Sequence, residues 1–154
     1  MKKLLAIIVL SLLFSGNASA QSMITIHKYL QENVNYLKDS ITLTYLYNRC
    51  SAAYIYAAEV TKDKMPDASK KFGEAAAVSY DFSNRLLITD LKYKPQDASK
   101  KNKEEINNMF KYYAKDGKDL YARTGKYMEN SYISLDLQSC NTLMQAFNVE
   151  WKNF

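Results

Sequence analysis

The sequence predicts an all-α protein: an antiparallel up-down-up-down four-helix bundle, preceded by a helical lead-in and stapled by one disulfide. Three observations predict it. Only 4 Gly and 2 Pro occur in 154 residues, whereas all-β folds need a turn about every 8–12 residues and use these residue types to make it. Apolar residues recur at steps of three and four along most of the chain, which is the spacing of one helix face. The two Cys fall in helices that this topology makes neighbours.

The first twenty residues have the pattern of a secretory signal peptide. Two lysines precede an apolar run over residues 4–14, and an Ala-Ser-Ala sequence follows at the cleavage site. The run is too short for a membrane span. We therefore expect residues 1–20 to be removed, leaving residues 21–154 as a single soluble helical domain that is periplasmic or secreted. An uncleaved N-terminal anchor is the alternative. The short signal and the lack of a glycosylation sequon in the mature chain suit a bacterial source.

Export changes how the cysteines are interpreted, because an even number of Cys in an oxidising compartment favours disulfides. Cys50 and Cys140 are the only two, and no C-x-x-C redox motif occurs. Two thiols and the single His27 cannot complete a structural zinc site. We predict a Cys50–Cys140 disulfide, with two free buried thiols as the alternative.

The lead-in covers residues 23–39 and has apolar residues at helical spacing. The first long helix follows over residues 40–62, with a strict seam of three and four residue steps. Periodicity alone does not decide whether these two segments form one helix or two, and a continuous or kinked helix is the favoured interpretation.

Two prolines mark the next boundaries, because Pro interrupts a helix and disfavours helical geometry at the preceding residue. Pro66 ends the first long helix, and Asp67 is a candidate N-cap for a helix over residues 68–92. Pro95 and Asp97 repeat this arrangement. A further helix then covers residues 98–128.

Two glycines, Gly117 and Gly125, weaken that helix by about 1 kcal/mol each relative to Ala, and a break near Gly125 is compatible with the pattern. The last helix begins near Asn130 or Ser131, either of which could cap it. It runs to the C-terminus, where we expect Trp151 and Phe154 to pack on the bundle. The first and last long helices are antiparallel neighbours in this topology, so the two sulfurs fall in one layer.

No catalytic constellation is present in the sequence. Nucleophilic catalysis by Ser or Cys usually requires a nearby base, most often His, and His27 is interpreted as a surface or interface residue. There is no Glu-x-x-His pair for a di-iron centre and no Gly-rich phosphate loop. We therefore expect neither a catalytic residue nor a bound cofactor or metal.

Arg49 is the main candidate site residue, because it lies in a strongly apolar helix beside Cys50. When antiparallel helices are aligned about their connecting turns, Asp81 lies at the same height as Arg49, with Tyr47 and Tyr54 nearby. A charge in a core generally requires a partner. A partly buried Arg49–Asp81 ion pair is the favoured interpretation. An anion-binding group in a Tyr-lined groove is the functional alternative, and a simply exposed Arg is the third.

Surface composition suggests which partners are plausible. There are 13 Tyr, and residues 92–118 hold eight Lys against four acidic residues. Tyr suits shoulders between helices and protein interfaces. The basic segment suits a solvated face or contact with an anionic envelope surface. Removal of residues 1–20 leaves a net charge of only +3, so neither charge nor compartment indicates nucleic acid.

The sequence favours a non-enzymatic binding or interaction protein of the bacterial periplasm, whose partner is another envelope protein or an anionic envelope surface. A small-ligand carrier with a pocket near Tyr47, Tyr54 and Arg49 is the alternative. A His-independent enzyme that uses Tyr and carboxylates is the third.

Overall fold

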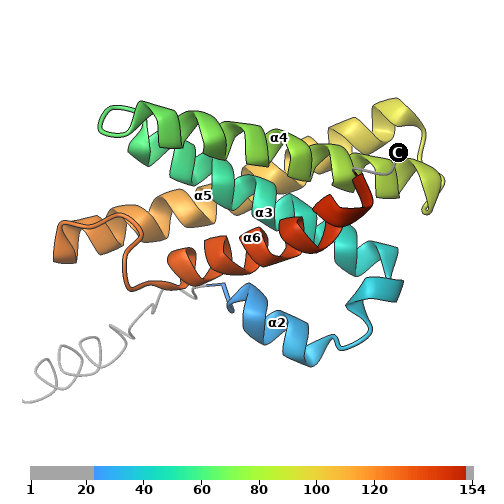
Figure 1. Ribbon diagram of the computed structural model, residues 1–154, viewed down its shortest axis with the longest axis horizontal. Helices are drawn as coiled ribbons and strands as arrows, with labels where there is room; N and C mark the ends of the chain where they lie inside the picture. The colour runs from blue at the N-terminus through green and yellow to red at the C-terminus, as the bar shows by residue number, and fades with distance from the viewer. Residues whose placement is uncertain (1–22, 152–154) are drawn as a thin grey trace, which may run out of the picture.

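Five α-helices and one short 3-10 helix make up the part of the chain that this computed structural model describes, residues 23–151, with side chains as far as residue 145 (Figure 1). No strand occurs within that part. The predicted signal peptide lies outside it. The elements are α2 (Ile26–Glu32), η1 (Tyr36–Lys38), α3 (Ser40–Thr61), α4 (Pro66–Thr89), α5 (Pro95–Thr124) and α6 (Tyr132–Trp151).

The central element is α3, which contacts η1, α4, α5 and α6. Within residues 42–57 only Tyr45 and Ile55 are not buried. A helix that is apolar on all sides is expected to lie in a core, and this sequence carries few charges. The other long helices pack around α3 in the predicted antiparallel order, so the all-α bundle is confirmed.

The lead-in and the first long helix are separate, which corrects the favoured interpretation of one continuous or kinked helix. Asn33 ends α2, and its side-chain amide donates to the carbonyl of Tyr29 at 2.8 Å. Asp39 is the N-cap of α3, where its carboxylate accepts from the backbone N–H of Ile41 at 3.1 Å. Side-chain caps of this kind compete with helix continuation. The chain therefore turns, and α2 packs against α6.

The helix starts after the two prolines also differ from the prediction. Pro66 and Pro95 are the first residues of α4 and α5, and Asp67 and Asp97 lie inside the first turns rather than at the N-caps. Proline suits the first helical position because it lacks the N–H that would be left unpaired there, and its φ is already helical. The two carboxylates still interact favourably with the helix dipole.

The boundary between α5 and α6 agrees with the sequence. Gly125 has φ of 72° and its N–H donates to the carbonyl of Tyr121 at 2.8 Å, which ends α5. Of the two candidate caps, Ser131 is the one used, because its Oγ accepts from the N–H of Ile133 at 3.2 Å. The expected packing of Trp151 and Phe154 involves side chains outside the described residues.

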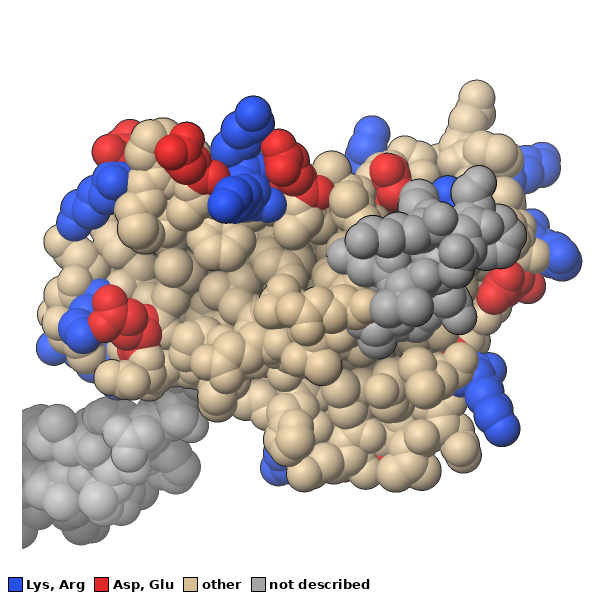
Figure 2. Space-filling model, in the orientation of Figure 1, with Lys and Arg blue, Asp and Glu red and all other residues tan. Residues whose placement is uncertain are grey.

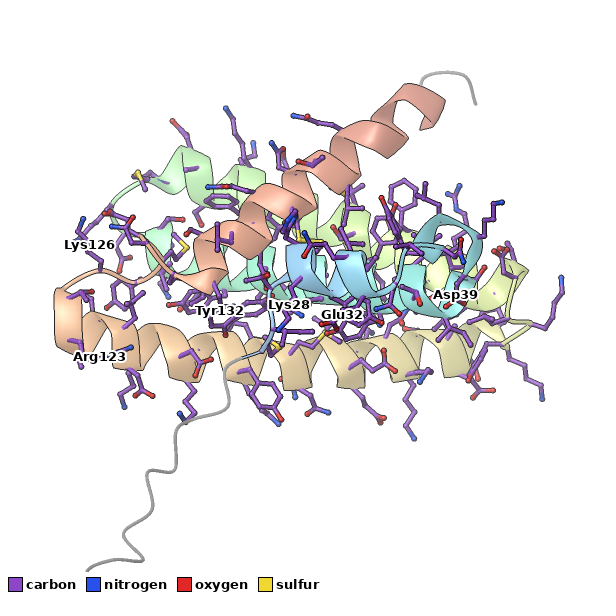
Figure 3. All side chains as sticks on the ribbon, turned by 90° about the horizontal axis from the view of Figure 1, so that it is seen from below. Lys28, Glu32, Asp39, Arg123, Lys126 and Tyr132 are labelled. Carbon is purple, nitrogen blue, oxygen red and sulfur yellow. A yellow bond between two sulfur atoms is a disulfide. The ribbon has the colours of Figure 1, made fainter. Side chains whose placement is uncertain are left out.

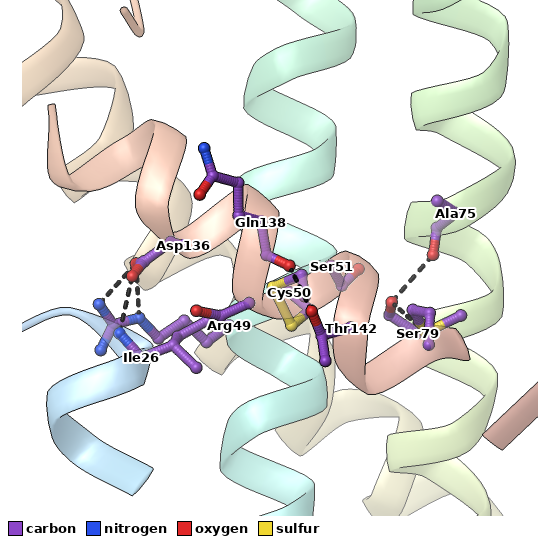
Figure 4. The surroundings of a disulfide bond; sticks show 12 residues. Ile26, Arg49, Cys50, Ser51, Ala75, Ser79, Asp136, Gln138 and Thr142 are labelled. Atoms are coloured by element: carbon purple, nitrogen blue, oxygen red, sulfur yellow. Dashed lines mark hydrogen bonds and ion pairs between the residues drawn. A yellow bond between two sulfur atoms is a disulfide. The ribbon is translucent and has the colours of Figure 1, made fainter. Parts of the chain in front are cut away.

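Cys50 of α3 and Cys140 of α6 form the predicted disulfide, with Cα atoms 5.4 Å apart (Figure 4). Both sulfurs are buried. The bond makes the first and last long helices direct neighbours, although α6 is inclined to the α5 axis (Figure 3). The disulfide is consistent with an oxidising compartment.

Within residues 23–151, no helix is both long enough and apolar enough to cross a membrane.

Candidate functional site

A buried ion pair lies beside the disulfide, between Arg49 of α3 and Asp136 of α6. The Arg49 Nη2 and Asp136 Oδ2 atoms are 2.6 Å apart, and both side chains are 0% exposed. The Arg49 Nε also donates to the same oxygen, at 3.1 Å. Charged hydrogen bonds of this kind are among the strongest in proteins, and they are closed to solvent here.

Two tyrosines complete the polar surroundings of the guanidinium. Tyr113 of α5 donates to Asp136 Oδ2 at 2.6 Å and accepts from Arg49 Nε at 3.2 Å, and Tyr45 accepts from Arg49 Nη1 at 3.0 Å. Burial alone would lower the pKa of Arg49, but Tyr113 and Asp136 outweigh that effect and raise it. Burial, followed by the charge of Asp136, raises the pKa of Tyr113 well above its usual value. At neutral pH the arginine is therefore charged and the tyrosine neutral.

The backbone at the start of α2 closes the cluster. The N–H of Ile26 donates to Asp136 Oδ1 at 2.7 Å, and the carbonyl of Ile24 accepts from Arg49 Nη2. Figure 4 shows Arg49, Asp136 and Ile26 converging next to Cys50. Every polar atom of the ion pair is used within the protein, so the cluster holds helices together and is not an anion site.

The sequence named the wrong partner for Arg49. Asp81 is exposed on α4, and the residue that pairs with Arg49 is Asp136. Tyr47 and Tyr54 do not join the cluster either: Tyr47 stacks on Phe82 with ring centroids 4.9 Å apart. Arg49, Tyr47 and Tyr54 are buried, and none of them lines the groove described below.

Tyr54 lies against Phe72 of α4, with ring centroids 6.3 Å apart. Burial raises the pKa of Tyr54 to about 12. It forms part of the packed interface between α3 and α4.

The signal for Asp136 was present in the sequence. Between residues 130 and 149 it is the only Asp, Glu, Lys, Arg or His, and it stands four residues, about one helical turn, before Cys140. Arg49 stands directly before Cys50. A disulfide between antiparallel helices therefore brings these two charges within about one and a half helical turns of each other.

A second buried polar cluster joins α3, α4 and α5. The Asn48 side-chain amide donates to Asn102 Oδ1 at 2.9 Å and to Glu105 Oε2 at 2.7 Å, and its oxygen accepts from Ser83. Lys101 pairs with the other oxygen of Glu105 at 2.6 Å. These bonds satisfy each other and fix the register of three helices.

The surface between α4 and α5 is an open groove of about 570 Å³ whose floor is α3. Its lining is mostly apolar, and Lys103 is its only charged residue. The lining residues are Ser51, Ile55, Gly73, Ala76, Ala77, Tyr80, Lys103, Ile106, Asn107 and Phe110. This is a concave surface of the size that small-molecule sites have.

The remaining sequence candidates lie on the surface. His27 is exposed on α2, 3.1 Å from the side chain of Gln31. The basic segment 92–118 forms much of α5, where Lys115 pairs with Asp119 at 3.1 Å. Within the described residues, no three His, Cys, Asp or Glu side chains are grouped to hold a metal ion.

Comparisons with protein families, with curated proteins and with solved structures found no match to this chain.

Proposed function

We propose that this chain is a non-enzymatic binding protein of the bacterial periplasm, and that the groove between α4 and α5 is its binding site. The observation that carries the proposal is the groove itself, an open apolar hollow lined by three helices. Exposed apolar surface is costly in water, and concave apolar sites commonly bind ligands. The signal-peptide pattern and the disulfide support export to an oxidising compartment.

Gly73 supports a role for the groove. It lies within α4, where glycine destabilises a helix by about 1 kcal/mol relative to alanine. No neighbour requires its small size, because a Cβ atom built there meets nothing within 4 Å. Because any side chain at this position would extend into the hollow or its rim, glycine keeps this part of the wall open.

The buried charges support a non-enzymatic role. Arg49 and Asp136 are 0% exposed and bind each other. A catalytic residue must reach a substrate, and this pair is covered by the N-terminal segment and by Tyr113. Arg49, the charged residue that the sequence singled out, is thus engaged in packing between helices.

Filling the groove tests the proposal. Ala77 lines it, whereas the neighbouring Val78 is exposed on α4 and does not. We expect the fluorescence of 1-N-phenylnaphthylamine to rise on binding to the mature protein and to Val78→Phe, but much less with Ala77→Phe. Circular dichroism and a denaturant midpoint establish that both variants fold. Equal binding by the three proteins would contradict the proposal.

A partner protein is the second candidate, favoured by a separate face. The outward side of α6 exposes Leu135 among uncharged polar side chains, and Asp136 is buried. Figure 2 shows few Lys, Arg, Asp or Glu side chains in the middle of this view, with most at its edges. Depletion of charge is typical of the centre of protein interfaces.

Native capture from envelope extract separates the two candidates. A partner lost with Leu135→Arg and kept with Ala77→Phe would favour the α6 face. A partner or co-purifying small molecule lost only with Ala77→Phe would favour the groove. The nearby Gln138→Arg variant, which is also exposed on α6, shows whether added charge alone disrupts capture.

A further inference from the structure

We propose that the groove between α4 and α5 binds a single-chain anionic amphiphile, an alkyl carboxylate, with its carboxylate at Lys103 and its alkyl chain directed toward Gly73. This inference rests on the proposed function and adds the ligand class and its orientation.

The charge of the site comes from Lys103 alone. Every other lining residue is uncharged. Lys101, two residues earlier, pairs with Glu105 at 2.6 Å, whereas Lys103 has no carboxylate within 4.0 Å in the described part of the chain. An unpaired ammonium beside an apolar hollow complements an anion that carries an apolar tail.

The other polar groups of the hollow are mostly engaged within the protein. The Ser51 hydroxyl donates to the carbonyl of Ala76 at 3.0 Å. The Tyr80 hydroxyl is hydrogen-bonded to Ser99 at 2.8 Å. The floor is therefore apolar toward a ligand. Asn107, one turn after Lys103 on α5, is exposed and adds an amide donor for the carboxylate.

The direction of the chain follows from the antiparallel helices. The Tyr80–Ser99 hydrogen bond ties the second half of α4 to the start of α5, so Lys103 lies toward that end. Gly73 is two helical turns before Tyr80 and lies toward the other end. The hollow between them, with the buried Ala76 and Ile106 in its walls, suits one alkyl chain.

Calorimetric titration of the mature protein with dodecanoate, below its micelle-forming concentration, tests the ligand class. Dodecyltrimethylammonium has the same chain and the opposite charge. We expect Lys103→Gln to weaken dodecanoate binding by about fivefold, the upper end for a solvent-exposed ion pair. The same variant should bind dodecyltrimethylammonium no more weakly than wild type. Lys111→Gln removes an equal charge from an exposed position of α5 outside the groove and should change neither affinity.

Chain length tests the orientation. Gly73→Leu fills the end of the hollow away from Lys103, so it should weaken dodecanoate binding more than hexanoate binding. Glu74→Leu, at the next and exposed position, is the matched control. Circular dichroism identifies any variant that fails to fold. The comparison of anion and cation binding by the wild-type protein tests the ligand charge without any mutation.

The outcomes separate this inference from the function on which it rests. Equal wild-type affinity for the anion and the cation, or no effect of Lys103→Gln, overturns the anionic ligand class. The groove still stands as the binding site in that case if Ala77→Phe abolishes alkyl binding. Loss of all alkyl binding from wild type overturns both. A stronger Gly73→Leu effect on hexanoate than on dodecanoate overturns the orientation alone.

Discussion

Arg49 and Asp136 are placed where water cannot solvate them, so each depends on the other for its charge. Moving two ions into a protein interior has a desolvation cost that their attraction offsets only when the remaining hydrogen-bonding groups are satisfied. Here Tyr113, Tyr45 and the backbone of residues 24–26 provide those bonds. The pair is thus stable only when all of these partners are in place, and it therefore specifies how α3, α5, α6 and the start of α2 pack together.

Removing one partner should be strongly destabilising. We expect Arg49→Ala to lower the free energy of unfolding by about 3–5 kcal/mol, because Asp136 is left charged and buried. Denaturant titration measures the change. Arg123→Ala, at an exposed site on α5, should change stability by less than about 0.5 kcal/mol. A comparably small change for Arg49→Ala would show that Asp136 finds other compensation.

Sequence reasoning recognised that Arg49 needed a partner, but chose it by levelling idealised straight helices. That arithmetic assumes that all helices are parallel or antiparallel to one axis, whereas α6 is inclined (Figure 3). Asp81 also has a solvated position available on α4. The disulfide was the more reliable guide, because a covalent bond fixes neighbours and periodicity only suggests them.

At the scale of elements, two helical glycines have opposite roles. A Cβ atom at Gly117 of α5 would lie 1.7 Å from the hydroxyl of Tyr56, a buried ring of α3. That glycine permits close approach of α3 and α5. Gly73 of α4 has open space beside it.

Alanine at the two positions should therefore change stability in opposite directions. Gly73→Ala should stabilise the protein by about 0.5–1 kcal/mol through helix propensity. Gly117→Ala should destabilise it by about 1–3 kcal/mol, because overpacking a buried contact outweighs the same propensity gain. Chemical denaturation of both variants in parallel provides the comparison, with each serving as the other's control. Stabilisation by both would mean that Tyr56 moves aside easily.

Element boundaries were less predictable than the elements. Helical spacing continues through residues 33–41, yet Asn33 and Asp39 end one helix and start another. The side-chain caps and the packing of α2 on α6 both favour this break, and hydrophobic periodicity contains no information about either. Pro66 and Pro95, by contrast, marked both later boundaries to within a few residues because their covalent geometry acts locally.

For the whole molecule, the disulfide joins residues 90 positions apart. A loop of that length reduces the entropy of the unfolded chain enough to stabilise the fold by about 4–5 kcal/mol. We expect reduction to lower the melting temperature markedly, and non-reducing peptide mapping to recover one peptide that joins α3 and α6. Two alkylatable thiols in protein exported to the periplasm would contradict the bond.

Alkaline pH should destabilise the whole fold. Burial raises the pKa of Tyr54 and, together with the charge of Tyr127, that of Tyr56 to about 12, compared with an ordinary value of 10. The folded state therefore favours the neutral phenols. Their contribution is complete below about pH 10 and is lost as pH rises toward 12.

Absorbance at 295 nm and denaturant midpoints follow this loss. Some phenols should ionise above pH 11 in the folded protein and near pH 10 in denaturant. Tyr54→Phe should reduce the decrease in stability between pH 10 and 11. A single ionisation near pH 10 in the folded state would rule out the burial effect.

The global architecture could be predicted because helix number, antiparallel order and the disulfide constrain one another. The groove could not, because its lining comes from three helices, and no sequence pattern describes a space between helices. Small lining residues such as Gly73 and Ala77 do not stand out from the helical spacing in the sequence.

The hydrogen bond from Ile26 to Asp136 spans 110 residues of sequence. A chain that crosses a membrane from its N-terminus emerges with residues 24–26 first and α6 last. The first segment to arrive therefore lacks the carboxylate that accepts from its Ile26 N–H until almost all of the protein has followed it. During that interval Arg49 also lacks its ion-pair partner, because Asp136 lies on α6. For such a chain, the N-terminal segment is among the last parts to reach its final position. Residues 24–26 close over the Arg49–Asp136 pair only after α6 has arrived.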